Sequence, residues 1–147
     1  LNFVYYPDKA FAVVSEPSSE MLKIAKTKQR ADRARLIQSC AEQLPFADHS
    51  FDAAFATLVF CSIARPEAAF AELRRVVKPG GAVMLLEHVR PSNLLGPLFD
   101  LLSWITVPLF DDHFNRRTAA TAKSAGLNVV RVEKSFLGII NLIACKV

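Results

Sequence analysis

Two ionisable side chains stand just after apolar runs, where a folded sheet would present them to a ligand. Glu16 follows the run 10–14, and His88 follows the run 82–86. Ligands of open parallel sheets bind beside the carboxyl ends of the strands. A carboxylate at such an end accepts hydrogen bonds from the hydroxyl groups of a bound sugar. An imidazole, which titrates near neutral pH, can act there as a general base.

Both residues also have a structural interpretation, and the sequence leaves the two open. Glu16 precedes an expected helix, where an acid interacts favourably with the helix dipole. His88 is equally suited to be a hydrogen-bonded structural histidine, and His49 and His113 are weaker candidates for catalysis. The histidines and acids show no spacing typical of a metal site, so no metal is predicted.

The elements that must position these residues alternate short apolar runs with helical patterns, which is typical of an α/β fold with a largely parallel sheet. The last two strands are expected to form an antiparallel edge. The predicted strands are 10–14, 35–39, 53–57, 82–86, 127–133 and 139–146. The first of them is continuously apolar, as is typical of a strand buried on both faces.

Three helices are predicted, one from about Ser18, one from about Pro66 and one over 116–125. Ser18 is a suitable N-cap, and Pro66 is tolerated at a first helical position. In the second helix an apolar stripe faces the core, whereas Glu72 and Arg74 are expected to face solvent. The segment 78–81, Lys-Pro-Gly-Gly, is expected to end this helix.

Length and composition bound the class of protein. The 147 residues suffice for one domain, and a hydrophobic fraction of 52% with 22% charged residues indicates a folded chain. The net charge of +4 arises from interleaved signs, and the basic stretch 23–35 is interpreted as a solvated helix end, so no nucleic-acid partner is predicted. Three scattered cysteines and no basic leader favour a reducing, cytoplasmic location.

The segment 94–110 is mostly apolar but contains Pro97, Asp100 and Pro108. These residues interrupt it too often for a membrane-spanning helix, which needs about 20 mainly apolar residues. We interpret the segment as a lid, a wall of the substrate site or a surface for peripheral membrane contact. A membrane-associated chain therefore stays open as an alternative location.

Four short segments occur in a fixed order along the chain. They are 15–22 (Ser-Glu-Pro-Ser-Ser-Glu-Met-Leu), 41–52 (beginning Ala-Glu-Gln-Leu-Pro-Phe), 73–81 (ending Lys-Pro-Gly-Gly) and 86–89 (Leu-Glu-His-Val). Together they resemble the class I S-adenosylmethionine-dependent methyltransferases, of the type that includes quinone, sterol and thiol methyltransferases. The tail around 115–118 resembles, less specifically, members that act on small molecules and lipids.

The resemblance implies S-adenosylmethionine as the cofactor and assigns roles to particular residues. Glu16 would hold the ribose, and Met21 would pack on the adenine ring. Ala41 and Glu42 would meet the adenine edge, and Thr57 with Leu58 would lie along the methionine part. The implied cofactor-binding residues are Glu16, Pro17, Met21, Ala41, Glu42, Thr57 and Leu58, with His88 as the candidate catalytic base. Cys40 stands where the family often has an aspartate.

The family's glycine-rich cofactor loop is expected before the strand 10–14, yet the nine residues there contain no glycine. The segment 1–7 resembles the stretch that follows that loop. The predicted fold is therefore a Rossmann-like methyltransferase sheet, mostly parallel with an antiparallel C-terminal edge, lacking the first strand and the glycine loop. The chain 1–147 is expected to form a single, partial domain of this kind.

The function predicted on this basis is methyl transfer from S-adenosylmethionine to a small-molecule or lipid-like acceptor. The alternative is a non-catalytic, degenerate or truncated methyltransferase-like domain that serves as an interaction module. A nicotinamide-dependent dehydrogenase also places an acid after a strand, but it lacks the linked Leu-Pro-Phe and Lys-Pro-Gly-Gly segments. The sequence does not define the acceptor or the oligomeric state.

Overall fold

The computed structural model describes residues 9–28, 34–91, 94–110, 113 and 116–147. Residues 1–7 and Asn115, which contribute to the resemblance above, lie outside these ranges. The described elements are β1 (Ala12–Glu16), α1 (Ser19–Lys28), β2 (Ala34–Gln38), β3 (Phe51–Thr57), α2 (Pro66–Val76), β4 (Val77–His88), α3 (Gly96–Phe110), α4 (Thr118–Ser124), β5 (Asn128–Ser135), the 3-10 turn η3 (Phe136–Gly138) and β6 (Ile140–Lys146).

The strands combine parallel pairs with an antiparallel C-terminal edge, which confirms the predicted α/β class. β1 pairs with β2 in parallel, and β3 pairs with β4 in parallel. β6 joins β4 and β5 in antiparallel fashion. The resulting orders are β1-β2 in one sheet and β3-β4-β6-β5 in the other.

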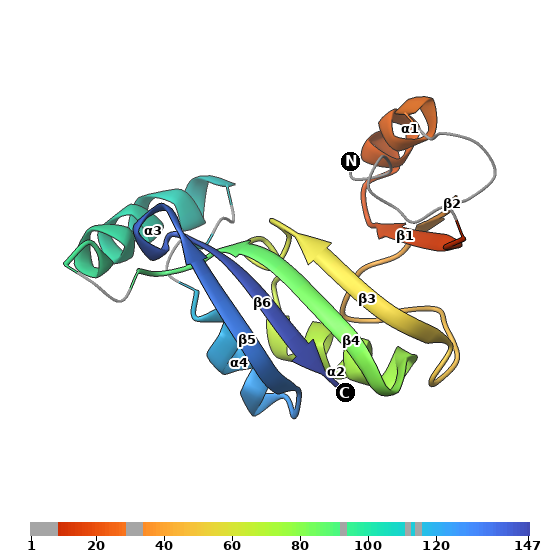
Figure 1. Ribbon diagram of the computed structural model, residues 1–147. Helices are drawn as coiled ribbons and strands as arrows, with labels where there is room; N and C mark the ends of the chain where they lie inside the picture. The colour runs from red at the N-terminus through yellow and green to blue at the C-terminus, as the bar shows by residue number, and fades with distance from the viewer. Residues whose placement is uncertain (1–8, 29–33, 92–93, 111–112, 114–115) are drawn as a thin grey trace.

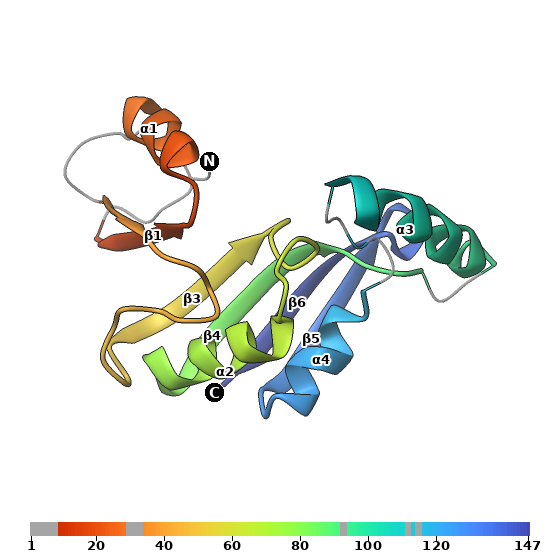
Figure 2. The ribbon, with the colours of Figure 1, turned by 180° about the vertical axis from the view of Figure 1, so that it is seen from behind.

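The chain divides between these two sheets at the connection from β2 to β3. Among the described strands, β1 pairs only with β2, and β3 pairs only with β4. Figures 1 and 2 show the β1–α1–β2 unit beside the β3 edge of the four-stranded sheet. One edge of β1 and one edge of β3 therefore carry no strand partner from the described residues.

The hydrophobic core lies on one face of the four-stranded sheet. Val83 and Leu85 of β4 and Ile143 of β6 are fully buried there, because alternate residues of a strand point to the same face. Figure 2 shows α2 and α4 covering this face. Phe55 and Met84 point to the opposite face and are exposed, and no described helix covers that face in either view.

All six strands are found, with boundaries shifted from the predicted ranges, and the shifts of β1 and β4 are the most informative. β1 spans Ala12–Glu16 instead of 10–14, and it is half-buried because β2 is its only described strand neighbour. β4 begins at Val77, so the segment 78–81 lies within the strand instead of before it. Gly81 fits there because a Cβ atom would lie 2.7 Å from the Asp52 carbonyl oxygen on β3.

The apolar segment 94–110 forms α3. Pro97 is its second residue, where proline is tolerated, and Pro108 lies in its last turn. Ser103 is buried, whereas Leu98, Leu101 and Trp104 are exposed. No helix of the described chain has the length and apolar character needed to cross a membrane.

Truncation of Phe70 tests the core. This α2 side chain is fully buried and stacks on Phe60 with ring centroids 4.2 Å apart. Phe70→Ala is expected to lower the free energy of unfolding by about 3–5 kcal/mol, because it removes apolar contacts and leaves a cavity. Phe136→Ala, at a 78% exposed position, serves as the control and should change it by about 0.5 kcal/mol or less. Urea denaturation measures both, and equal effects would contradict this core.

Candidate functional site

Glu16 occupies the carboxyl end of β1, next to the start of α1. Its Oε1 accepts a hydrogen bond from the Ser18 backbone N–H at 3.0 Å. Ser18 Oγ accepts one from the Met21 N–H at 3.2 Å, which confirms Ser18 as the cap of α1. Met21 is 52% exposed on the same turn. The structure thus brings Glu16, Pro17 and Met21 together on one strand-to-helix turn.

The end of β2 is bound to this turn by side-chain hydrogen bonds. Gln38 Nε2 donates to the Pro17 carbonyl oxygen at 3.0 Å. Ser15 Oγ donates to the Ser39 carbonyl oxygen at 3.0 Å and lies 2.7 Å from Ser39 Oγ. The parallel pair Glu16 and Gln38 closes the ladder between the two strands. The segment leading to Ala41 is therefore held beside Glu16.

Ala41 and Glu42 lie on the turn that follows β2, and both are half-buried. Ala41 packs against the core of the four-stranded sheet. Glu42 Oε1 accepts a hydrogen bond from the Arg65 N–H at 3.4 Å, at the N-terminal end of α2. This turn links the β1–β2 end to the loop that follows β3.

Thr57, Leu58 and His88 lie at the carboxyl ends of β3 and β4. Thr57 is the last residue of β3, and Leu58 follows it in the left-handed backbone region with φ of 53°. The Leu58 N–H donates to the Leu86 carbonyl oxygen at 2.8 Å. His88 ends β4 and is half-buried. The parallel register of β3 and β4 thus places all three residues at the same end of the sheet.

Glu87, next to His88, is fully buried. Its Oε1 accepts hydrogen bonds from the backbone N–H groups of Val59 at 3.0 Å and Phe60 at 3.2 Å. Burial raises the pKa of this carboxyl, and the two N–H groups partly offset that rise. Sequence reasoning placed Glu87 beside His88 without a role of its own. Its spacing of two residues from Leu85 and four from Val83, which places all three on one face of the strand, was the available signal for burial.

Arg75 of α2 binds the loop between β2 and β3. Its guanidinium donates to Glu72 and Asp48, each at 2.7 Å, and to the carbonyl oxygens of Phe46 and Leu44 at 2.7 and 3.0 Å. Glu72 Oε2 accepts the Leu44 N–H at 2.7 Å. The hydrogen bond from Arg75 is the main cause that lowers the pKa of Glu72.

The prediction that Glu72 faces solvent was therefore wrong. Glu72 is half-buried because it turns toward the 44–48 loop, whereas Arg74 is exposed as predicted. Helical periodicity places residues on a face of their own helix, but it does not show which loop packs beside that face. The sequence carried no signal for Arg75 as the centre of this network.

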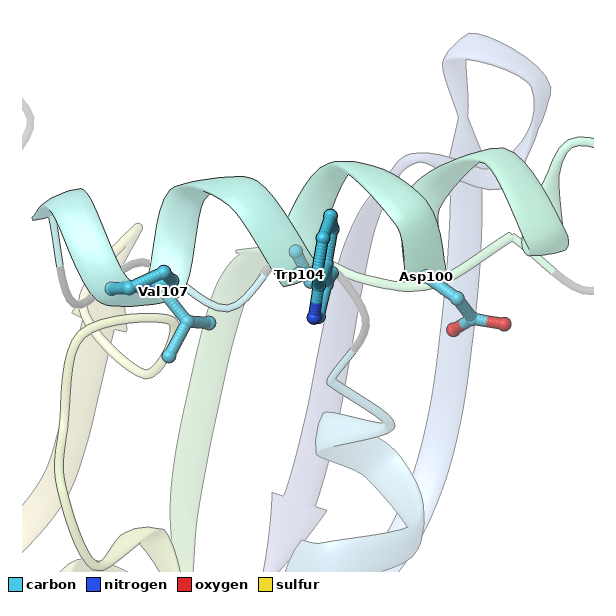
Figure 3. A pocket seen from close by; sticks show the side chains of 5 residues that line it. Asp100, Trp104 and Val107 are labelled. Atoms are coloured by element: carbon cyan, nitrogen blue, oxygen red, sulfur yellow. The ribbon is translucent and has the colours of Figure 1, made fainter.

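An open depression lies along α3 (Figure 3). It has a volume of about 430 Å³ and is lined by Asp100, Ser103, Trp104, Val107 and Pro108. Asp100 is engaged in an ion pair with Arg90 at 2.8 Å. Every lining residue comes from one helix, and none belongs to the predicted cofactor set. The depression is therefore separate from the strand ends that carry Glu16 and Thr57.

Residues 4–85 match a family described as a methyltransferase domain. The match covers more than half of the 147 residues and includes the turn after β1, the turn after β2 and the end of β3. The chain belongs to this methyltransferase domain family. The residues after β1 suit S-adenosylmethionine chemically, because the Glu16 carboxylate can accept hydrogen bonds from hydroxyl groups and the exposed Met21 thioether offers an apolar surface to a ring.

Curated relatives support the assignment. The ubiquinone/menaquinone biosynthesis C-methyltransferase UbiE of Azotobacter vinelandii is 34% identical over 102 residues, covering 66% of this chain and 40% of that protein. The UbiE of Burkholderia cenocepacia is 34% identical over 117 residues, covering 72% of this chain and 48% of that protein. The chain thus spans less than half the length of these two relatives.

Solved structures share the fold. An S-adenosylmethionine-dependent methyltransferase of Thermotoga maritima superposes with a TM-score of 0.73 at 21% identity, covering 97% of this chain and 84% of that chain. One from Mesorhizobium loti gives 0.73 at 12% identity, covering 94% and 81%. The Rossmann-like methyltransferase fold predicted from the sequence is confirmed.

Replacement of Arg75 by lysine tests the organisation of the 44–48 loop. A lysine carries one donor group and cannot reach two carboxylates and two carbonyls at once. Arg75→Lys is expected to raise amide hydrogen exchange of residues 44–48 several-fold and to lower the melting temperature. The control is Arg74→Lys, one residue earlier and exposed. Equal exchange in the two variants would contradict the network.

The raised pKa of Glu87 predicts a pH dependence of stability. A carboxyl whose pKa is higher in the folded than in the unfolded state makes its full contribution to the stability of the fold at pH values below its ordinary titration range. That contribution is lost as the pH rises through the raised pKa. Glu87→Gln cannot ionise, so the stability of the variant relative to the wild type should increase with pH across this window. Urea denaturation at several pH values measures it, with the exposed Glu133→Gln as control. A difference that does not vary with pH would contradict the shift.

Proposed function

We propose that this chain forms most of the cofactor site of an S-adenosylmethionine-dependent methyltransferase that acts on a small-molecule or lipid-like acceptor. The observation that carries the proposal is the position of Glu16. Its carboxylate ends a parallel strand beside a capped helix, and the hydrogen bond from Gln38 to the Pro17 carbonyl oxygen ties this turn to the end of β2, shortly before Ala41. Family membership gives this arrangement its ligand.

The cofactor supplies an electrophilic methyl group on a sulfonium. Glu16 Oε1 is engaged by Ser18, and the carboxylate can accept hydroxyl hydrogen bonds from the ribose with its remaining lone pairs. The exposed thioether of Met21 offers a soft surface for the adenine ring. Pro17 fixes the backbone between these two side chains, and Ala41 and Glu42 provide the facing turn.

Methyl transfer needs the acceptor held in line with the departing sulfur, so positioning supplies much of the rate. Thr57 and Leu58 stand at the carboxyl end of β3 for this purpose. His88, at the end of β4, can take a proton from an acceptor that must lose one. Its half-buried position leaves part of the side chain open to a ligand.

The class of acceptor is inferred from α3 and from the relatives. Figures 1 and 2 show α3 at the end of the four-stranded sheet where β4 ends. Its exposed side chains are Leu98, Leu101, Leu102, Trp104, Ile105 and Leu109. An apolar surface beside the reacting end favours an apolar acceptor. The UbiE relatives are named for quinone biosynthesis, and we propose a quinone-like or other lipid-like acceptor here.

Replacement of Glu16 tests the cofactor site. Glu16→Ala removes the charged acceptor of two hydroxyl hydrogen bonds and is expected to weaken S-adenosylhomocysteine binding by about ten- to a hundredfold. The melting temperature should stay close to that of the wild type. Calorimetric titration into the 147-residue chain measures the affinity.

The matched control is Glu67→Ala, which removes the same charge from the exposed first turn of α2. Its affinity should equal that of the wild type. Equal affinities of Glu16→Ala and the wild type would remove Glu16 from the site. Absence of binding to the folded wild-type chain would contradict a cofactor site formed by these residues.

A further inference from the structure

The two oxygens of the buried Glu87 carboxyl have different surroundings. The side chain shares the covered face of β4 with Val83 and Leu85, which are fully buried as it is. A carboxyl in such apolar surroundings is costly unless its oxygens are hydrogen-bonded. The contacts of its two oxygens therefore indicate what the side chain is for.

Oε1 holds the turn that leaves β3. It accepts the N–H groups of Val59 and Phe60, at 3.0 and 3.2 Å. The preceding Leu58 is in the left-handed region, which is unfavourable for a non-glycine residue. The Leu58 N–H is itself bound to the Leu86 carbonyl oxygen. Adjacent residues of β4 thus hold three successive N–H groups of this turn, one through the main chain of Leu86 and two through the carboxyl group of Glu87.

Glu87 lies opposite Asn141 of β6 in the strand register. Glu87 and Asn141 are register partners in the antiparallel β4–β6 pair, so their side chains leave the same face of the sheet. Both residues are buried, and within the described chain neither Glu87 Oε2 nor Asn141 Oδ1 has a hydrogen-bond partner. A proton on Oε2 can be donated to Oδ1, which would satisfy both oxygens. The raised pKa of Glu87 is consistent with that proton.

We propose that Glu87 is a positioning residue: its side chain anchors the turn 58–60, supported by Asn141, and thereby sets where Thr57 and Leu58 stand at the carboxyl end of β3. This inference rests on the proposed function, in which those two residues lie along the methionine part of the cofactor. Glu87 acts through the turn and does not touch the reacting atoms.

Two substitutions distinguish the length of the Glu87 side chain from its hydrogen-bonding capacity. Glu87→Asp keeps a carboxyl but withdraws it by one methylene from Val59 and Phe60. Glu87→Gln keeps the oxygen in place, and its amide nitrogen can donate to Asn141 as the protonated acid does. Amide hydrogen exchange should become about tenfold or more faster at Val59 and Phe60 in Glu87→Asp, whereas Glu87→Gln should retain the wild-type rates. Wild-type rates in Glu87→Asp would overturn the anchoring.

Cofactor affinity then tests the positioning role. S-adenosylhomocysteine binding is expected to weaken about tenfold in Glu87→Asp and to recover in Glu87→Gln. Ile143→Val is the matched control, because it trims a buried side chain of β6 opposite Leu85 and leaves the hydrogen bonds from Glu87 to Val59 and Phe60 in place. It should destabilise the fold while leaving the affinity unchanged. If Ile143→Val loses as much affinity for S-adenosylhomocysteine as Glu87→Asp does, Glu87 contributes only to the stability of the fold and has no positioning role.

Other outcomes distinguish the two proposals. Faster exchange with unchanged affinity in Glu87→Asp would overturn the positioning role and leave the proposed function intact. Failure of the folded wild type to bind would refute the proposed function, and the positioning role with it, whatever the exchange shows. If Glu87→Asp does not fold, the anchoring can be tested in the wild type by NMR. Scalar coupling between the backbone nitrogens of Val59 and Phe60 and the Glu87 carboxyl carbon would show the hydrogen bonds directly. Absence of that coupling would overturn the anchoring.

Discussion

Burial of one face of β4 is the constraint on which the rest of the structure depends. β4 lies between β3 and β6, and its inward residues Val83 and Leu85 belong to the same core cluster as Phe70 of α2 and Ala122 of α4. Apolar area removed from water here is the main stabilising contribution to the four-stranded sheet. Burial of β4 also requires a partner strand on each side, because the main-chain N–H and C=O groups of a buried strand need hydrogen-bond partners. The ends of β3 and β4 are thereby fixed relative to each other.

The proposed site depends on that core through its loops. Three connections carry the residues assigned to the cofactor, and polar side chains hold each one to a regular element. Glu16 and Ser18 order the turn after β1, Arg75 and Glu72 of α2 order the loop after β2, and Glu87 holds the turn after β3. Because hydrogen bonds to charged groups are directional and strong, they give loops a definite geometry that apolar contacts alone would not.

The two faces of the four-stranded sheet differ in what covers them. α2 and α4 pack on one face, whereas Phe55 and Met84 on the other are exposed within the described residues. The division of the described strands into two sheets leaves β3 at the edge of the four-stranded sheet. α3 adds a further apolar surface at the end of the sheet. Apolar surface therefore accumulates around the end at which we place the acceptor.

The sequence by itself determined the order of the six strands with α1, α2 and α4, the mostly parallel sheet with its antiparallel C-terminal edge, and the family, because apolar runs, Pro-Gly punctuation and the order of four segments are local properties of the chain. It also found Ser18 as a cap. It did not predict the helix α3 or the division of the strands into two sheets. Only the tertiary structure decided that Glu87 is buried against the turn after β3 and that Arg75 gathers the 44–48 loop, since these contacts join residues 27 to 31 positions apart. Such pairs depend on how strands and helices pack, and no local pattern records which side chain meets which distant backbone group.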